Sequence, residues 1–167
     1  MIKRIAAFDP GGTTGWAYVD IDVETQETTF HCGMLQAKEH HKELFDFLGH
    51  LDVQDFTVVS ESFEYRNASR AGLVLSSVEY IGVIKHFCQE RKVPVVFQMA
   101  AQGKIRDKPN AFVKPDNLKR LGLYHPSQVH AMDAYGHLLY YIIHTLSHRE
   151  SGYDELRLKL LARGWQV

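Results

Sequence analysis

An Asp-Pro-Gly-Gly turn near the start of the chain joins two segments that favour β-structure, residues 3–8 and 14–22. Proline and glycine interrupt regular structure sharply, so these segments are predicted to pair as an antiparallel hairpin. A third strand is expected at residues 27–35. The hairpin constrains the fold strongly, because all later elements have to pack on a sheet that begins with antiparallel strands.

After these strands the pattern changes to alternating helices and strands. Helices are predicted at residues 38–51 and 68–91, and short apolar strands follow them at residues 56–60 and 93–97. A helix between two strands implies that the strands pair in parallel. The chain is therefore expected to form an α/β domain with a mixed sheet. The second helix is predicted to bury one side, made of Leu73, Val74, Val78, Ile81, Ile84 and Phe87.

The last third of the chain starts with an irregular segment. Residues 99–117 contain a glycine, two prolines and several charges, which indicates a loop or short helices that suit substrate binding. A helix is predicted to start at Pro126 and Ser127 and to run to about Ser147. Its apolar stripe consists of Val129, Met132, Leu139, Ile143 and Leu146. A short terminal helix is expected at residues 152–163.

Size and composition limit the class of protein. The 167 residues, 45% of them hydrophobic, suit one globular domain that spans residues 1–167. The longest strongly apolar stretch, residues 136–146, is too short to cross a bilayer, so we expect no membrane association and a cytoplasmic location. Cys32 and Cys88 are far apart and indicate neither a disulfide framework nor a cysteine-based zinc site. The net charge of -1 does not suggest a protein that coats nucleic acid.

Acidic side chains occur where predicted strands end. Asp9 ends the first strand, and Glu61 ends the strand at residues 56–60. If those two strands are parallel neighbours, both carboxylates lie at the edge where open α/β sheets bind ligands. His130 and Asp133, three positions apart on the last long helix, share a face and can reach the same point.

Carboxylates that converge at one polar spot repel each other unless a cation lies between them. Oxygen-rich ligands indicate Mg²⁺ or Mn²⁺, and the candidate ligands are Asp9, Glu61, His130 and Asp133. Two ions per site can clamp the attacking and leaving oxygens of a phosphodiester, so no covalent nucleophile is required. A nearby lysine can stabilise the charge that accumulates on the phosphate. These residues therefore favour hydrolysis of nucleic acid.

Four segments resemble, in order and spacing, the successive active-site regions of RuvC-like Holliday junction resolvases. They read IAAFDPGGTTGWAYV, VVSESFEY, QMAAQGK and HAMDAYGHLLYY. The similarity extends from about residue 2 to residue 143. It implies that Asp9 is the first metal ligand and Glu61 the central glutamate. It also implies that His130 and Asp133 form the last ligand pair, with a histidine at a position that is usually acidic.

The resemblance implies further properties of the protein. These are a ribonuclease H-like fold with a five-stranded mixed sheet in the order 3-2-1-4-5, a homodimer packed through the helix after Glu61, and metal-dependent cleavage of branched DNA. The branched substrates are Holliday junctions and, for compact relatives, flaps and forks. Lys104 resembles the catalytic lysine of the family, and Lys108 and Lys114 are nearby alternatives.

Aromatic and basic side chains near these positions are candidates for contacts with DNA. Phe63 and Tyr65 follow Glu61 and can stack on an unpaired base at the open centre of a junction, while core packing is the alternative for Phe63. Phosphate contacts along the rim are assigned to Arg66, Arg70, Lys104, Arg106, Lys108, Lys114, Lys119 and Arg120.

Three further histidines are given ordinary roles. His137 lies seven positions after His130, and we expect it to be packed or solvated rather than to bind zinc. His40 and His41 are not expected to form a second metal site, because adjacent residues on a helix do not face each other. Both are expected to face water, since the start of this helix is polar.

Two other functions remain open. Residues 9–15, DPGGTTG, can be read as the phosphate loop of the sugar kinase and actin ATPase superfamily, although those enzymes need two such domains to close on ATP. The other alternative is a catalytically silent DNA-binding module of the same fold. Asp9, Glu61 and Asp133 together argue against it, since an inactive site has no reason to hold carboxylates that repel each other.

Overall fold

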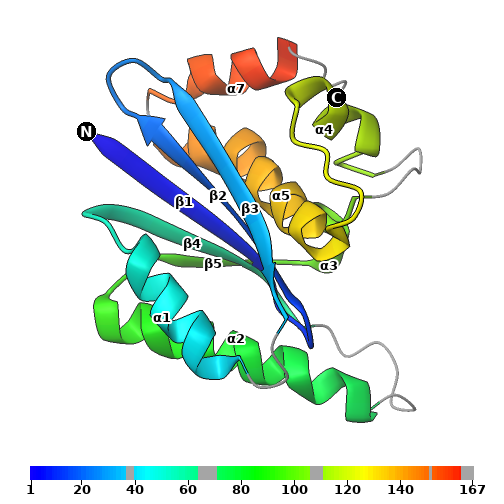
Figure 1. Ribbon diagram of the computed structural model, residues 1–167. Helices are drawn as coiled ribbons and strands as arrows, with labels where there is room; N and C mark the ends of the chain where they lie inside the picture. The colour runs from blue at the N-terminus through cyan, green and yellow to red at the C-terminus, as the bar shows by residue number, and fades with distance from the viewer. Residues whose placement is uncertain (37–39, 64–70, 106–110, 151, 163–167) are drawn as a thin grey trace.

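The computed structural model describes residues 1–36, 40–63, 71–105, 111–150 and 152–162. A five-stranded mixed sheet in the order β3-β2-β1-β4-β5 runs through the described part of the chain, as predicted (Figure 1). Its strands are β1 (Ile2–Asp9), β2 (Thr14–Asp22), β3 (Thr28–Leu35), β4 (Asp55–Glu61) and β5 (Val95–Gln98).

The pairing of the strands brings two acidic residues to one edge of the sheet. β1 and β2 form the predicted antiparallel hairpin, with Asp9 opposite Gly15. β1 and β4 are parallel neighbours, with Phe8 opposite Ser60. Asp9 and Glu61 each come next after this last pair, so the two side chains end adjacent parallel strands.

Helices cover both faces of the sheet (Figure 1). α1 (His41–Leu51) and α2 (Ala71–Arg91) lie on one face, and α5 (Val129–Tyr141) crosses the other, with α7 (Asp154–Ala162) beyond it. The remaining helices are short: α3 (Ala100–Gly103), α4 (Pro115–Leu121) and α6 (Ser147–Arg149). None of the helices in the described ranges is long and apolar enough to span a membrane.

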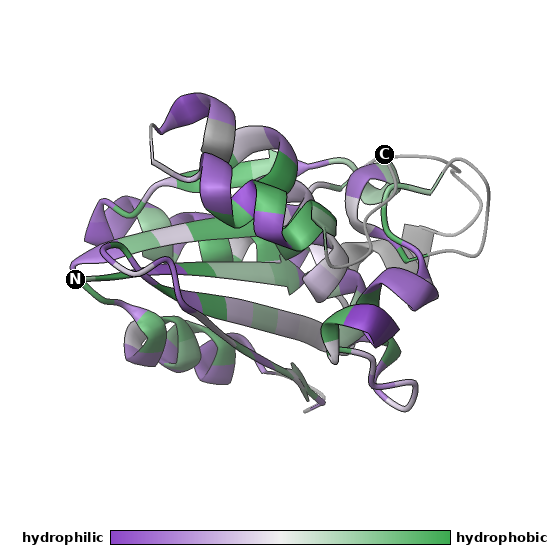
Figure 2. Cartoon of the chain, turned by 90° about the horizontal axis from the view of Figure 1, so that it is seen from above, coloured by the Kyte–Doolittle hydropathy of each residue, from purple (hydrophilic) through white to green (hydrophobic). Residues whose placement is uncertain are grey.

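Each face of the sheet has its own hydrophobic core. Successive residues of β1 point to opposite faces, so Ile5 and Ala7 pack toward α5 while Ala6 and Phe8 pack toward α1 and α2. Figure 2 shows the apolar stretches of the strands lying between helices that carry hydrophilic residues. This two-sided burial holds the end of β1, and therefore Asp9, in a fixed place.

Several predicted helix details were wrong. α5 begins at Val129 rather than at Pro126, with Gln128 as its N-cap. Val129 is 62% exposed, because it stands at the first position of the helix, where the core ends. Val78 is 43% exposed and faces away from the core, while Ile81, Ile84 and Phe87 of the same predicted stripe are buried. The structure does not describe the side chains of Leu73 and Val74.

Two local irregularities were also not predicted. α5 continues into a π-helical turn, Ile142–Leu146, before α6. β5 begins at Val95, two residues later than expected, because Pro94 has no N–H to pair with β4. The carbonyl of Pro94 still accepts a hydrogen bond of 2.9 Å from the N–H of Val58.

Candidate active site

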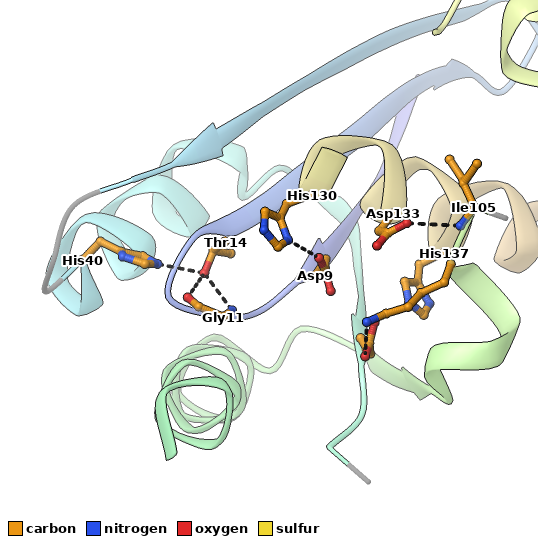
Figure 3. Close-up of polar contacts among 10 residues, drawn as sticks. Asp9, Gly11, Thr14, His40, Ile105, His130, Asp133 and His137 are labelled. Carbon is orange, nitrogen blue, oxygen red and sulfur yellow. Dashed lines mark hydrogen bonds and ion pairs between the residues drawn. The ribbon is translucent and has the colours of Figure 1, made fainter. Parts of the chain in front are cut away.

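The candidate site forms where the ends of β1 and β4 meet the first turns of α5 (Figure 3). α5 can lie this close because residue 15 of β2 is a glycine. A Cβ atom at Gly15 would lie 2.0 Å from the carbonyl oxygen of His130. The close contact between β2 and α5 therefore sets the position of His130 above the end of β1.

Asp9 and His130 form the first pair of the site. Nδ1 of His130 lies 2.8 Å from Oδ2 of Asp9, whose side chain is almost completely buried (Figure 3). The hydrogen bond to Asp9 raises the pKa of His130. The pKa of Asp9 is itself raised, because burial and the neighbouring charge of Glu61 outweigh the lowering effect of His130.

Asp133 lies one turn further along α5. Its Oδ1 accepts a hydrogen bond of 3.1 Å from the backbone N–H of Ile105, in the segment that follows α3 (Figure 3). Burial, followed by the negative charge of Asp9, raises the pKa of Asp133 to about 6. Raised pKa values at Asp9 and Asp133 are expected when buried carboxyl groups are close to one another without a compensating cation.

Glu61 has different partners on its two oxygens. Oε1 lies 3.4 Å from Nζ of Lys104, and Oε2 lies 3.2 Å from Nε2 of His137. Burial alone would raise the pKa of Glu61, but the hydrogen bond with His137 and the charge of Lys104 outweigh it and leave the pKa lowered. Glu61 is therefore the carboxylate of this site that stays ionised most readily.

Lys104 reaches Glu61 because α3 packs directly on α5. A Cβ atom at Gly136 of α5 would lie 1.7 Å from the carbonyl oxygen of Gly103, the last residue of α3. Two glycines thus allow the backbones to touch, and Lys104 follows at once. The structure brings Lys104 to the predicted site, together with Asp9, Glu61, His130 and Asp133.

A pocket of about 200 Å³ adjoins Glu61 and Lys104. Its walls come from the turn after β1, the ends of β4 and α3, and α2, and they are formed by Pro10, Glu61, Ser62, Phe63, Ser77, Ile81, Ala100 and Lys104. Phe63 is 36% exposed, so it belongs to this wall rather than to the core. The structure therefore argues against the core-packing alternative for Phe63.

The other predicted DNA contacts are placed less completely. Lys114 is half-buried and is the N-cap residue of α4. Lys119 and Arg120 are exposed on α4. The remaining candidates lie outside the described residues, namely Tyr65, Arg66, Arg70, Arg106 and Lys108.

The expectation for His40 was wrong, because His40 is completely buried. Its ring stacks on Tyr80 of α2 at a centroid distance of 3.9 Å, and its Nε2 lies 2.8 Å from Oγ1 of Thr14. α1 begins only at His41, so His40 precedes the helix and turns inward. His41 is partly exposed and lies 3.4 Å from a carboxylate oxygen of Glu79.

His137 is the residue of the site that the sequence interpretation did not assign. We expected His137 to be either packed or solvated, and it is packed. It also contacts Glu61 directly. Its spacing on α5, four positions after Asp133 and seven after His130, is the signal that could have placed it on the same face.

The chemistry of these side chains suits a divalent cation, since three carboxyl groups supply the oxygen ligands that Mg²⁺ and Mn²⁺ prefer. In the structure, these side chains do not form a complete coordination shell for a metal ion. Within the described residues, no three His, Cys, Asp or Glu side chains are arranged to hold one ion. Asp9 is bonded through Oδ2 to His130, and Asp133 through Oδ1 to the N–H of Ile105, so one oxygen of each carboxyl group already has a protein partner.

Comparisons with known proteins identify the fold. No protein-family model matches the sequence, and no curated protein matches it significantly. Two structures of Thermus thermophilus RuvC match with a TM-score of 0.58, at 18% and 20% identity, and one of them is a complex with a Holliday junction substrate. Both matches cover 83% of this chain and 92% of the RuvC chain.

A viral protein gives the same result. The Fowlpox virus resolvase, in a complex with Holliday junction DNA, matches with a TM-score of 0.58 at 13% identity, over 84% of this chain and 96% of that chain. The order of the strands and the position of the site at the ends of β1 and β4 are thus found in a molecule that retains little sequence similarity to these proteins. The chain has the fold of the RuvC-like Holliday junction resolvases.

Proposed function

We propose that this protein is a divalent-metal-dependent endonuclease that cleaves phosphodiester bonds in branched DNA. One observation carries the proposal: three carboxyl groups and Lys104 gather at the ends of β1 and β4, in a protein with the fold of junction resolvases. The raised pKa values of Asp9 and Asp133 support it, because burial and then the neighbouring carboxylates raise them, and a bound cation would favour the ionised forms.

The proposed ligands of Mg²⁺ or Mn²⁺ are Asp9, Glu61, His130 and Asp133, with two ions per site. When bound, these ions supply an activated water and neutralise charge on the phosphate. Nζ of Lys104 lies 3.4 Å from Oε1 of Glu61 and is proposed to stabilise the developing negative charge on the phosphate oxygens. Burial of Asp9 limits the access of bulk water to the carboxylates.

Branched DNA is the proposed substrate because RuvC and the Fowlpox virus resolvase have both been solved with Holliday junction DNA. Flaps and forks are included in the proposal as further branched forms. Phe63, on the wall of the pocket, is proposed to stack on an unpaired base. Tyr65, Arg66, Arg70, Lys108 and Lys114 remain proposed contacts with DNA.

A homodimer is part of the proposal, because a four-way junction has two symmetric strands to cut and each subunit carries one site. α2 is the proposed contact. Val78 supports it, since this apolar side chain is 43% exposed on α2.

The decisive experiment measures cleavage of Holliday junction, flap, fork and linear duplex DNA with Mg²⁺, with Mn²⁺ and with a chelator. We expect metal-dependent cleavage of branched DNA, and the substitutions Asp9→Asn, Glu61→Gln and Asp133→Asn are each expected to abolish it without loss of folding or junction binding. Asp116→Asn is the matched control, because Asp116 is an exposed carboxylate of α4 that pairs with Lys119. Full activity in any of the three site variants would refute the assigned site.

The same assay separates the alternatives. A catalytically silent module would bind junctions but cut none of them in any metal. A kinase-like protein would turn over ATP, which the endonuclease is not expected to do.

A further inference from the structure

His137 is a completely buried histidine with a side-chain partner on each ring nitrogen. Nε2 lies 3.2 Å from Oε2 of Glu61, and Nδ1 lies 2.8 Å from Oε1 of Gln98. His137 belongs to α5, whereas Glu61 and Gln98 are the last residues of β4 and β5. The ring therefore connects α5 to two adjacent strands at the edge of the site.

The direction of the hydrogen bond to Glu61 follows from the chemistry of its partner. An ionised carboxylate only accepts, so Nε2 carries the hydrogen and donates it to Glu61. Gln98 is 3% exposed, and its Nε2 has no hydrogen-bond partner among the described residues. Rotation of the Gln98 amide by 180° would place its Nε2 instead of its Oε1 at Nδ1 of His137. The donation from His137 to Glu61 is the same in both orientations.

The ring is also held sterically. A Cβ atom at Gly103 would lie 2.2 Å from Cγ of His137, so the imidazole fills the space that this glycine leaves open. The contact between Gly103 and Gly136 holds α3 and α5 together around the ring. The packing around His137 therefore holds its ring in one orientation.

These contacts divide the two oxygens of Glu61. Oε2 faces the protein interior at His137, and Oε1 faces Lys104 on the side of the pocket. Oε1 is thus the oxygen on the side of Lys104 and the pocket, where a cation and a phosphate are proposed to bind. Without a donor at position 137, Oε2 would lose its hydrogen bond to His137 in the interior, and rotation of the carboxylate toward water or Lys104 would offset that cost.

We propose that His137 is a positioning residue, which holds Oε2 of Glu61 so that Oε1 is presented to the proposed metal and to Lys104. The inference rests on the proposed function of the site. Donors of this kind, which orient a metal-binding side chain, change metal affinity or activity by about ten- to a hundredfold when they are removed. His137 needs no contact with DNA for this role.

The test compares His137→Leu, which removes the donor, with His137→Gln, whose amide nitrogen reaches about as far as Nε2 and restores it. Leu138→Ala is the control for lost packing, because Leu138 is the next residue of α5 and is completely buried in the core. Stability is measured by thermal unfolding, Mn²⁺ binding by calorimetry, and cleavage of a Holliday junction under saturating conditions.

We expect His137→Leu to weaken Mn²⁺ binding and to lower kcat by about ten- to a hundredfold, with KM for the junction unchanged. His137→Gln should recover most of both losses. Leu138→Ala should lose stability but keep kcat and Mn²⁺ affinity. Equal losses of kcat in His137→Leu and Leu138→Ala, or no recovery in His137→Gln, would show that His137 serves only packing.

Crystal structures of the metal-free variants test the proposal even if the protein cleaves no DNA. Glu61 should keep its orientation toward Lys104 in His137→Gln and lose it in His137→Leu. An unchanged Glu61 in His137→Leu would overturn the positioning role. Absence of cleavage by the wild-type protein, with Glu61 displaced as expected in His137→Leu, would instead refute the proposed function and leave the role of His137 standing.

Discussion

Nδ1 of His130 lies 2.8 Å from Oδ2 of Asp9, although 121 positions separate the two residues in the chain. The hydrogen bond favours the protonated ring and so raises the pKa of His130. Protonated His130 donates a hydrogen bond to Oδ2 of Asp9, which is a proposed metal ligand. Proton and metal therefore compete at Asp9.

This competition predicts how metal binding depends on pH. As the pH rises above the raised pKa of His130, the ring loses its proton, and the dissociation constant for Mn²⁺, measured by calorimetry, should fall. His130→Gln should flatten this dependence. His148→Gln is the control, since His148 is exposed on α6. An equally steep dependence in His130→Gln would exclude the competition.

Asp133 predicts an effect on stability. Its pKa is about 6 in the folded protein against an ordinary value of 3.8, so the folded state holds the proton more tightly and the free energy of unfolding falls as the pH rises from about 4 to 6. Without metal at pH 7.5, Asp133→Asn should therefore be more stable than the wild type by roughly 1–3 kcal/mol, and at pH 4 the difference should vanish. Urea unfolding in the presence of a chelator measures both values.

Addition of Mg²⁺ gives the control for this prediction. The cation should stabilise the wild type at pH 7.5 and have little effect on Asp133→Asn. Equal stability of the two proteins at pH 7.5 without metal would mean that neither burial nor the charge of Asp9 disfavours the ionised form of Asp133.

Lys104 can be distinguished from the other candidate lysine that the structure describes. Lys104→Met removes the charge beside Glu61 and should lower the single-turnover cleavage rate by about a hundredfold or more. Lys114→Met should change junction binding more than the rate, because Lys114, at the start of α4, is a proposed contact with DNA. A larger loss of rate in Lys114→Met would reverse the assignment.

Phe63 tests how unpaired bases are recognised. Phe63→Ala should weaken binding of a Holliday junction by about tenfold or more, the range expected for loss of one stacked base. Phe63→Trp should retain binding, and the affinity for linear duplex should not change in either variant. Since Phe63 is 36% exposed, Phe63→Ala should lower the thermal stability less than truncation of a fully buried phenylalanine of the core would. Equal weakening toward duplex and junction DNA would exclude a stacking role.

The central sheet and most of the site could be predicted from sequence, because they depend on the periodicity of apolar residues and on the order of helices and strands along the chain. Alternation of helices and strands indicated parallel pairing, and the resemblance to RuvC-like resolvases implied the strand order that makes β1 and β4 neighbours. Parallel strands carry their last residues to one edge. Asp9 and Glu61 were therefore expected together, and the structure places them so. Helical spacing likewise placed His130 and Asp133 on one face.

The parts that could not be predicted depend on distances across the fold. His137 reaches Glu61 only because α3 and α5 touch at two glycines, and no periodicity reports such a contact. His40 lies outside α1 by one residue, so a rule for neighbouring helical residues did not apply to it. Its partners, Tyr80 and Thr14, come from two other elements.

The glycine contacts of α5 have a consequence for anyone who redesigns this sequence. Gly15, Gly103 and Gly136 each stand where even a methyl group would overlap backbone or ring atoms. A designer who keeps this backbone has to set these three positions first, and the choice of ligands comes afterwards. Diversified libraries that spare every acidic residue but randomise the glycines would then produce many inactive clones with an intact set of carboxylates.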